Sequence, residues 1–233
     1  IAQSVTVAGY TISGAEARNY SLVQPQGVQA TINPTELTVG GIKALSRSYD
    51  GTTVASVVNA DFAEGDAPVA LAGSLSGILG GDVVTLDGSS VTGNFADKDV
   101  GNNKSVTVAG FTLGGIQAGN YVVVQPTLTA DITKAMLAIG GLSAEDKVYD
   151  GTVNATLAGT GAASFVIEAT NEIVRGLVID SYLAEFDDRH VDAGKTVTLR
   201  SLTLGGTNAS NYGVLLTEVN VAFDANDPNS TER

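Results

Sequence analysis

The segment Lys104-Ser-Val-Thr-Val-Ala-Gly110 recurs almost unchanged as Gln3-Ser-Val-Thr-Val-Ala-Gly9, and its centre returns as Lys195-Thr-Val-Thr-Leu199. Each copy alternates apolar and polar residues, is rich in Val and Thr, and lies beside a glycine, a pattern typical of short β-strands. The spacing between copies is about 100 residues, which is the size of a small independent domain. The segment therefore predicts a β-rich domain that is repeated along the chain.

Two further motifs recur in the same order. Ser48-Tyr-Asp-Gly-Thr52 matches Val148-Tyr-Asp-Gly-Thr152. An Ala-x-Asn-Tyr motif occurs three times, at 17–20, 118–121 and 209–212. Solenoids and propellers repeat every 20–50 residues or so, and therefore a period near 100 favours separate domains in tandem.

The motif positions predict four parts of the chain. Residues 1–34 are expected to be the C-terminal half of a preceding repeat, and residues 35–135 a full repeat. Residues 136–224 are expected to form a divergent repeat, and residues 225–233 a polar tail. The stretch between each Tyr-Asp-Gly motif and the next Phe-x-Asp block differs in length between the two full repeats. This difference places an insertion in a loop or hairpin.

The fold class is predicted to be all-β, because no segment shows a sustained helical period. Gly-Gly, Asp-Gly and Gly-Asn pairs separate the short apolar runs and are typical of turns. Each unit would have about seven strands, which favours a small β-sandwich of the immunoglobulin-like kind. A β-grasp-like unit is the alternative. The Ala-x-Asn-Tyr motifs are candidates for single helical turns.

Composition excludes several classes of partner and chemistry. The 233 residues carry a net charge of −13, which repels nucleic acids and anionic membrane surfaces. There is no cysteine, so disulfides and thiolate metal sites are absent. No apolar run approaches the roughly 20 residues that span a bilayer. Because residue 1 is Ile, we expect the chain to be a monomeric segment of a longer protein.

Together the motifs resemble the YDG-type repeats, related to the MBG repeats, of large bacterial surface proteins. The resemblance is carried by Lys147-Val-Tyr-Asp-Gly-Thr152, Phe95-Ala-Asp-Lys-Asp-Val-Gly101, Asn120-Tyr121 and Gln125-Pro126. It implies a secreted, extracellular stalk or adhesive array of a filamentous-haemagglutinin-like adhesin exported by two-partner secretion. Roles in cell attachment, biofilm formation and virulence would follow. It implies no catalytic residue and no enzymatic activity. The last repeat departs from the pattern, because Arg189-His190 replaces Lys98-Asp99.

The repeated motif residues are interpreted as structural. In the Tyr-Asp-Gly motifs, Gly supplies a positive φ, Asp bonds the local backbone and Tyr packs its ring over the sheet. In the Ala-x-Asn-Tyr motif, Asn ends a turn and Tyr starts a strand. The residues assigned this structural role are Tyr49, Asp50, Gly51, Tyr149, Asp150, Gly151, Asn120 and Tyr121.

One acidic loop is a candidate for calcium. Asp97, Asp99 and Asn102 alternate oxygen ligands as the start of a calcium loop does. The bidentate Glu expected at the twelfth position is missing, because residue 108 is Val. Solvated acidic turns are therefore the preferred interpretation, and no other cofactor is predicted.

Three functions remain open on the sequence alone. The preferred one is a stalk that presents cell attachment. The first alternative is a module that binds a host or matrix glycan, a protein or a neighbouring cell through the variable stretches 52–94 and 152–185. The second is a linker stiffened by calcium. Catalysis would have to use His190, the single histidine, which has no counterpart in the other repeat.

Overall fold

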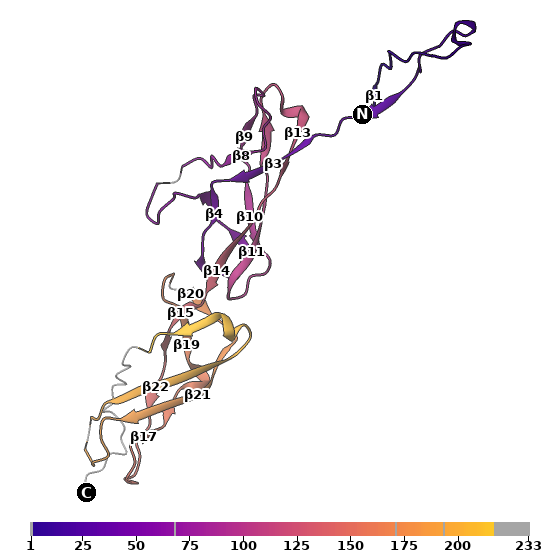
Figure 1. Ribbon diagram of the computed structural model, residues 1–233. Helices are drawn as coiled ribbons and strands as arrows, with labels where there is room; N and C mark the ends of the chain where they lie inside the picture. Colours follow the sequence, from indigo (N-terminus) through magenta and orange to yellow (C-terminus); the bar gives the residue numbers. More distant parts are fainter. Residues whose placement is uncertain (1, 68, 171, 193, 217–233) are drawn as a thin grey trace. The chain divides into compact units, whose positions relative to one another are not determined.

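The computed structural model describes residues 2–67, 69–170, 172–192 and 194–216 (Figure 1). The chain is all-β, as predicted, and folds into tandem small β domains with several small sheets. In the described residues the helical segments are four 3₁₀ turns. None of them is long and apolar enough to cross a membrane. Short runs of Val, Thr and Ile broken by glycines leave no length of chain for a longer helix.

The chain forms two compact units. The first comprises Ile1–Lys43, Val57–Thr92 and Val108–Pro126, and the second comprises Ala44–Ser56, Gly93–Thr107 and Thr127–Arg233.

In the first unit, strand β3 (Thr35–Gly40) lies between two partners. It pairs in parallel with β13 (Tyr121–Val124) and antiparallel with β8 (Ser74–Ser76). Smaller pairs complete the unit, namely β1 (Ala2–Ser4) with β2 (Gln29–Thr31), β9 (Thr85–Asp87) with β12 (Thr112–Gly114), and β4 (Ile42–Ala44) with β7 (Val57–Asn59). Leu37, at the centre of β3, is fully buried.

A glutamine clip recurs in the first unit. The Gln125 side chain donates from Nε2 to the carbonyl of Phe111 (2.9 Å) and accepts from its N–H (3.1 Å). Gln24 makes the same two bonds with Tyr10, at 2.9 and 3.2 Å. Residues 10–24 therefore have the same closing contact as residues 111–125, although the strands β1 and β2 beside them are exposed throughout.

The second unit contains a five-stranded sheet of order β5-β14-β11-β10-β6. Its strands are β5 (Arg47–Ser48), β6 (Val54–Ala55), β10 (Thr92–Phe95), β11 (Gly101–Ala109) and β14 (Thr127–Thr133). Strand β14 is antiparallel to β11 and parallel to β5. A single residue, Lys134, separates β14 from β15 (Ala135–Gly140).

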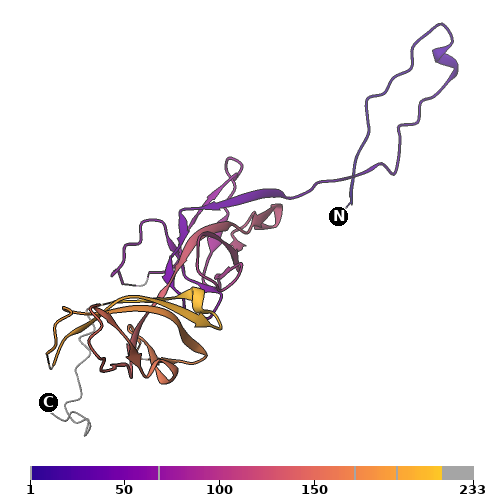
Figure 2. The same ribbon diagram turned by 90° about the horizontal axis from the view of Figure 1, so that it is seen from below.

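Strand β15 organises the rest of the second unit. It pairs in parallel with β23 (Tyr212–Val214) and antiparallel with β19 (Ser164–Ile167), which continues to β20 (Glu172–Val174). Strands β21 (Leu177–Phe186) and β22 (Val197–Gly206) form a long hairpin, visible in both views, that also carries β17 (Asn154–Ala155) (Figures 1 and 2). A short pair joins β16 (Ser143–Ala144) to β18 (Leu157–Ala158).

Two apolar clusters stabilise this part of the chain. One cluster contains Leu157, Ala184, Phe186, Val197 and Leu199. The other contains Leu137, Phe165 and Leu177. The first is built from alternate residues of the paired strands β21 and β22 with Leu157, and the second joins strands of two different sheets.

Each Ala-x-Asn-Tyr motif forms a 3₁₀ turn. These turns are η1 (Ala17–Asn19), η2 (Ala118–Asn120) and η4 (Ala209–Asn211), whereas η3 (Thr160–Ala162) has a different sequence. In the last two copies of the motif the Tyr begins a strand, β13 or β23.

Candidate functional site: the Tyr-Asp-Gly turns

The two Tyr-Asp-Gly motifs form the same closed turn. Oδ1 of Asp50 accepts hydrogen bonds from the Thr52 N–H (2.8 Å) and hydroxyl (2.9 Å), and Asp150 accepts the same bonds from Thr152 at the same distances. The glycine that follows each Asp has φ of 79° in both turns. That left-handed conformation favours glycine, because a side chain there would clash with the backbone.

A cation closes each turn from the side. Nη1 of Arg47 lies 2.6 Å from Oδ1 of Asp50, and its Nη2 donates to the Thr52 carbonyl at 2.6 Å. In the second turn Nζ of Lys147 makes the two equivalent contacts. It lies 2.9 Å from Oδ1 of Asp150 and donates to the Thr152 carbonyl at 2.9 Å.

The same two cations also lie over aromatic rings. The guanidinium of Arg47 is 5.3 Å from the centre of the Phe95 ring, and Nζ of Lys147 is 5.7 Å from the centre of the Phe186 ring. Both distances are typical of cation–π pairs. Each turn is therefore fixed to the strand that carries this Phe.

The cations change the acidity of the turn aspartates. The hydrogen bond from Lys147, with those from Thr152, lowers the pKa of Asp150 from 3.8 to about 2. Partial burial raises the pKa of Asp50, but the bonds from Thr52 and the charge of Arg47 outweigh it and leave that pKa below its usual value. Both carboxylates are therefore ionised at neutral pH.

The tyrosines of the two turns differ. Tyr49 is 6% exposed, and its ring meets the ring of Tyr212 edge-on, with centres 5.4 Å apart and planes at 81°. Tyr149 is 60% exposed. The expectation that these rings pack over their sheet is therefore wrong for Tyr149. Burial, together with the nearby Tyr49 and Glu172, raises the pKa of Tyr212.

In each repeat an acidic loop follows the Phe that lies under the cation. Both loops contain an Asp–Lys ion pair at equivalent positions of the repeat. Nζ of Lys104 lies 2.5 Å from Oδ1 of Asp97, and Lys195 contacts Asp188 in the same way. The hydrogen bond from each lysine lowers the pKa of its partner, to about 2 for Asp188.

The first of these loops binds a distant asparagine. Asn211 is 2% exposed, donates from Nδ2 to Oδ1 of Asp99 (2.8 Å) and accepts from the N–H of Val100 (2.9 Å). Among the described residues, Asn211 is the polar residue that is buried. Both its amide oxygen and its amide nitrogen have a hydrogen-bond partner. Asn120, at the same place in the other motif, is exposed, while Tyr121 beside it is buried and donates its hydroxyl to Asp82 (2.6 Å).

Two of the three proposed calcium ligands already have protein partners. Asp97 binds Lys104 and the N–H of Asp99, Asp99 binds Asn211, and Asn102 is exposed in β11. Among the described residues no three His, Cys, Asp or Glu side chains are grouped closely enough to hold a metal ion. Calcium binding stays a prediction.

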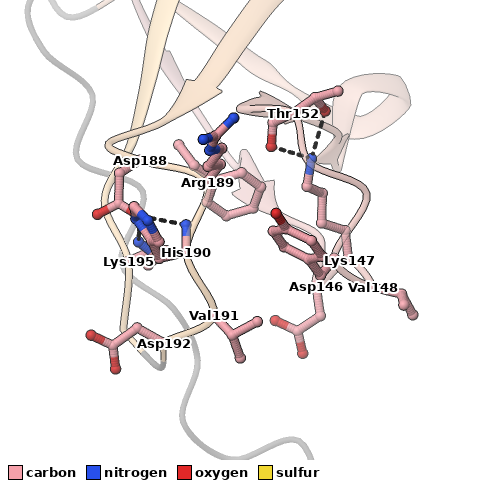
Figure 3. Close-up of a pocket in the computed structure, with 12 residues that line it drawn as sticks. Asp146, Lys147, Val148, Thr152, Asp188, Arg189, His190, Val191, Asp192 and Lys195 are labelled. Atoms are coloured by element: carbon pink, nitrogen blue, oxygen red, sulfur yellow. Dashed lines mark hydrogen bonds and ion pairs between the residues drawn. The ribbon is translucent and has the colours of Figure 1, made fainter.

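A pocket of about 390 Å³ lies between the second turn and the second acidic loop (Figure 3). Asp146, Lys147 and Val148 form one side, and Arg189, His190 and Val191 face them from the other. His190 is 81% exposed at its side chain, and its Nδ1 lies 3.3 Å from Oδ1 of Asp188. The lining therefore mixes exposed apolar groups with charges, of which Lys147, Asp188 and Lys195 are paired within their own loops.

Four contributors to this site did not stand out in the sequence: Arg47, Lys147, Asn211 and Tyr212. The signal that would have found the first two is a basic residue two positions before Tyr in both turns. Asn211 and Tyr212 belong to the Ala-x-Asn-Tyr motif, which the sequence shows three times. The residues next to the motif do not indicate in which copy the Asn is buried.

The fold and these motifs define a tandem array of small β domains. The family model of the YDG domain matches residues 33–130 and again residues 133–220. Because these two matches cover most of the chain, the protein belongs to the YDG domain family. The comparison with curated proteins found no match, and neither did the comparison with solved structures.

Proposed function

We propose that this chain is an extracellular stalk segment of a bacterial surface adhesin, of the filamentous-haemagglutinin-like type exported by two-partner secretion. In this role the YDG domains hold an attachment region away from the cell and transmit the force that acts on it. The chain contributes no catalytic group and acts through its own folded domains.

The observation that carries the proposal is the parallel pairing, in each repeat, of its first strand with the strand that follows the Ala-x-Asn-Tyr turn. Thr35–Thr38 of β3 pair with Tyr121–Val124 of β13, and Ala135–Leu137 of β15 pair with Tyr212–Val214 of β23. Tension enters each repeat at the start of its first strand and leaves beyond the end of the partner strand, in the first repeat through β14. Because the two strands run in the same direction, that tension loads all their hydrogen bonds in shear together. This arrangement suits a domain that bears load.

The connection between the repeats supports the same role. Only Lys134 lies between β14 and β15, so tension passes from one strand to the next without a flexible linker. The net charge of −13 would also keep neighbouring copies on a crowded surface apart.

A segment replacement tests the proposal in the protein displayed on its own cells. Residues 35–224 are exchanged for an inert β-sandwich spacer of equal length, and in a second variant for a spacer of half that length. Surface display is matched by antibody labelling before adherent cells are counted. We expect unchanged adhesion with the equal spacer and reduced adhesion with the short one.

Loss of adhesion with the equal spacer would overturn the stalk proposal. It would show that the segment itself binds a glycan, protein or neighbouring cell. Retained adhesion with both spacers would also count against it, because length would then not matter.

A further inference from the structure

The pocket between Lys147 and His190 occupies the same place in its repeat as a surface that is already filled in the other repeat. That filled surface consists of Tyr49 from the first turn and Asp99–Val100 from the first acidic loop. Its occupant is Asn211–Tyr212, from the Ala-x-Asn-Tyr motif of the repeat that follows. All of these residues belong to the second compact unit.

The contact in the filled surface has two parts. The amide of Asn211 donates to Asp99 at 2.8 Å and accepts from the Val100 N–H at 2.9 Å. It therefore bonds both an acceptor and a backbone donor of the loop. The ring of Tyr212 covers the ring of Tyr49 edge-on at 5.4 Å. Paired aromatic rings contribute about 0.5–1.5 kcal/mol beyond the area that they bury. The ring of Tyr212 is thus one of the groups that cover Tyr49, whose N–H also bonds the Thr133 carbonyl at 2.8 Å.

The second repeat presents the same groups without such an occupant among the described residues. Tyr149, Val148 and Val191 are 60%, 90% and 86% exposed. Exposed apolar groups clustered around one hollow are typical of a surface that binds another protein. The N–H of Val191 corresponds to that of Val100, which binds Asn211 in the filled surface.

The one substitution among the contacted residues conserves the chemistry. His190 stands where the first repeat has Asp99. Nδ1 of His190 faces the Asp188 carboxylate at 3.3 Å, and in the neutral ring with its proton on Nδ1 the Nε2 atom accepts a hydrogen bond. An asparagine amide can therefore donate to His190 as Asn211 donates to Asp99.

We propose that this pocket is a docking site for the Ala-x-Asn-Tyr turn of a further YDG domain that follows in the same polypeptide. The Asn of that turn binds His190 and the Val191 N–H, and its Tyr covers Tyr149. The proposal rests on the repeat architecture and does not depend on the adhesive role. It makes each junction between YDG domains a specific contact of the same two motifs.

Disulfide trapping tests the docking, because the chain has no cysteine of its own. The chain is extended by placing a second copy of residues 135–216 after residue 225, the position that aligns with Lys134. In this extended chain, His190→Cys is combined with Asn211→Cys in the added copy. The matched control keeps Asn211→Cys in the added copy and replaces His190→Cys with Val178→Cys. Val178 lies on β21 and is 53% exposed.

The native chain supplies the reference, since Asp99→Cys with Asn211→Cys places cysteines at the contact already seen. We expect the His190 pair to cross-link like this reference and at least about tenfold more than the Val178 pair, because docking raises the effective concentration of the two thiols. Cross-linking no greater than that of the Val178 pair would overturn the proposal.

A second measurement does not use cysteine. Nitration of Tyr149 by tetranitromethane is followed by peptide mass spectrometry in the native and in the extended chain, with Tyr49 as the protected reference. The added copy carries Tyr149→Phe, so that only the original Tyr149 is measured. We expect Tyr149 to react freely in the native chain and to be protected in the extended one. Equal nitration of Tyr149 in both chains would contradict the docking even if the cysteine variants misfold.

Discussion

The turns at 48–52 and 148–152 have the same backbone bonds, the same glycine conformation and equivalent cations over equivalent phenylalanines, yet they differ in one property. Tyr49 is 6% exposed and Tyr149 is 60% exposed. The ring of Tyr49 contacts Tyr212, and the acidic loop of its repeat binds Asn211, both of which come from the repeat that follows.

The comparison separates two levels of organisation in a repeat protein. Bonds within four or five residues, such as those of Asp50 and Asp150, are the same wherever the motif occurs. Burial of the neighbouring Tyr depends on whether an adjacent repeat covers it. A repeat motif therefore specifies a local shape and a surface, and the neighbour determines whether that surface is an interface.

The largest expected difference between the two turns concerns their tyrosines. Tyr49→Ala should lower the free energy of unfolding by about 3 kcal/mol, because a buried ring is lost and Tyr212 is left facing a cavity. Tyr149→Ala should change it by less than about 0.5 kcal/mol, as an exposed substitution does. Urea unfolding followed by circular dichroism measures both. Equal costs would show that the burial of Tyr49 contributes nothing to stability.

The asparagines give the next largest effect. Asn211→Ala removes the two hydrogen bonds of a buried amide and leaves the N–H of Val100 without its partner, at a cost of about 2 kcal/mol. Asn120→Ala is the matched control, since Asn120 is exposed in the same 3₁₀ turn, and should be near neutral. The same unfolding assay applies. A neutral Asn211→Ala would mean that water replaces the amide without cost.

The glycines should show no difference between the turns. Gly51→Ala and Gly151→Ala each force a side chain into a conformation with φ of 79°, at a cost of about 1 kcal/mol in either turn. Only Tyr49 Oη comes within 4.0 Å of an added Cβ at Gly51, and nothing does at Gly151. Thermal unfolding of the two variants should therefore give the same shift, and unequal shifts would show that the turns differ locally after all.

Acid should remove a smaller contribution from the second turn. Asp150 has its pKa lowered from 3.8 to about 2, so its ionised form stabilises the fold above about pH 4 and loses that effect as the pH falls through 2. Asp150→Asn should therefore lower Tm at pH 6, and its difference from the parent chain should shrink as the pH falls to 2 and below. Asp61→Asn, in an exposed acidic loop, is the control. A Tm difference that is constant from pH 6 to pH 2 would contradict the role of the charge.

Calcium should have the smallest effect. Because Asp97 and Asp99 are already bound by Lys104 and Asn211, adding millimolar calcium should shift Tm by less than about 1 °C. Scanning calorimetry with calcium and with a chelator measures the shift. A large rise in Tm that Asp97→Asn abolishes would support the calcium-stiffened linker instead.

Much of the molecule could be predicted before the structure. The alternation of Val and Thr, the turn glycines and the period of about 100 residues gave the all-β class and the tandem domains. The Tyr-Asp-Gly motif gave the local turn, because its Asp and Gly act on their immediate neighbours. The acidic loop at 97–102 was harder, since the sequence shows where carboxylates lie and not which cations or amides reach them.

The sequence by itself therefore determined the strands, the turns and the repeat, which depend on short-range sterics and hydrogen bonds that each residue carries with it. Only the tertiary structure decided that Asn211 is buried against Asp99 while Asn120 is exposed, and that Tyr49 is covered while Tyr149 is open. These outcomes depend on contacts between residues more than a hundred positions apart, as the Asn211–Asp99 bond is at 112. Identical motifs cannot record such contacts, because the partner lies outside them.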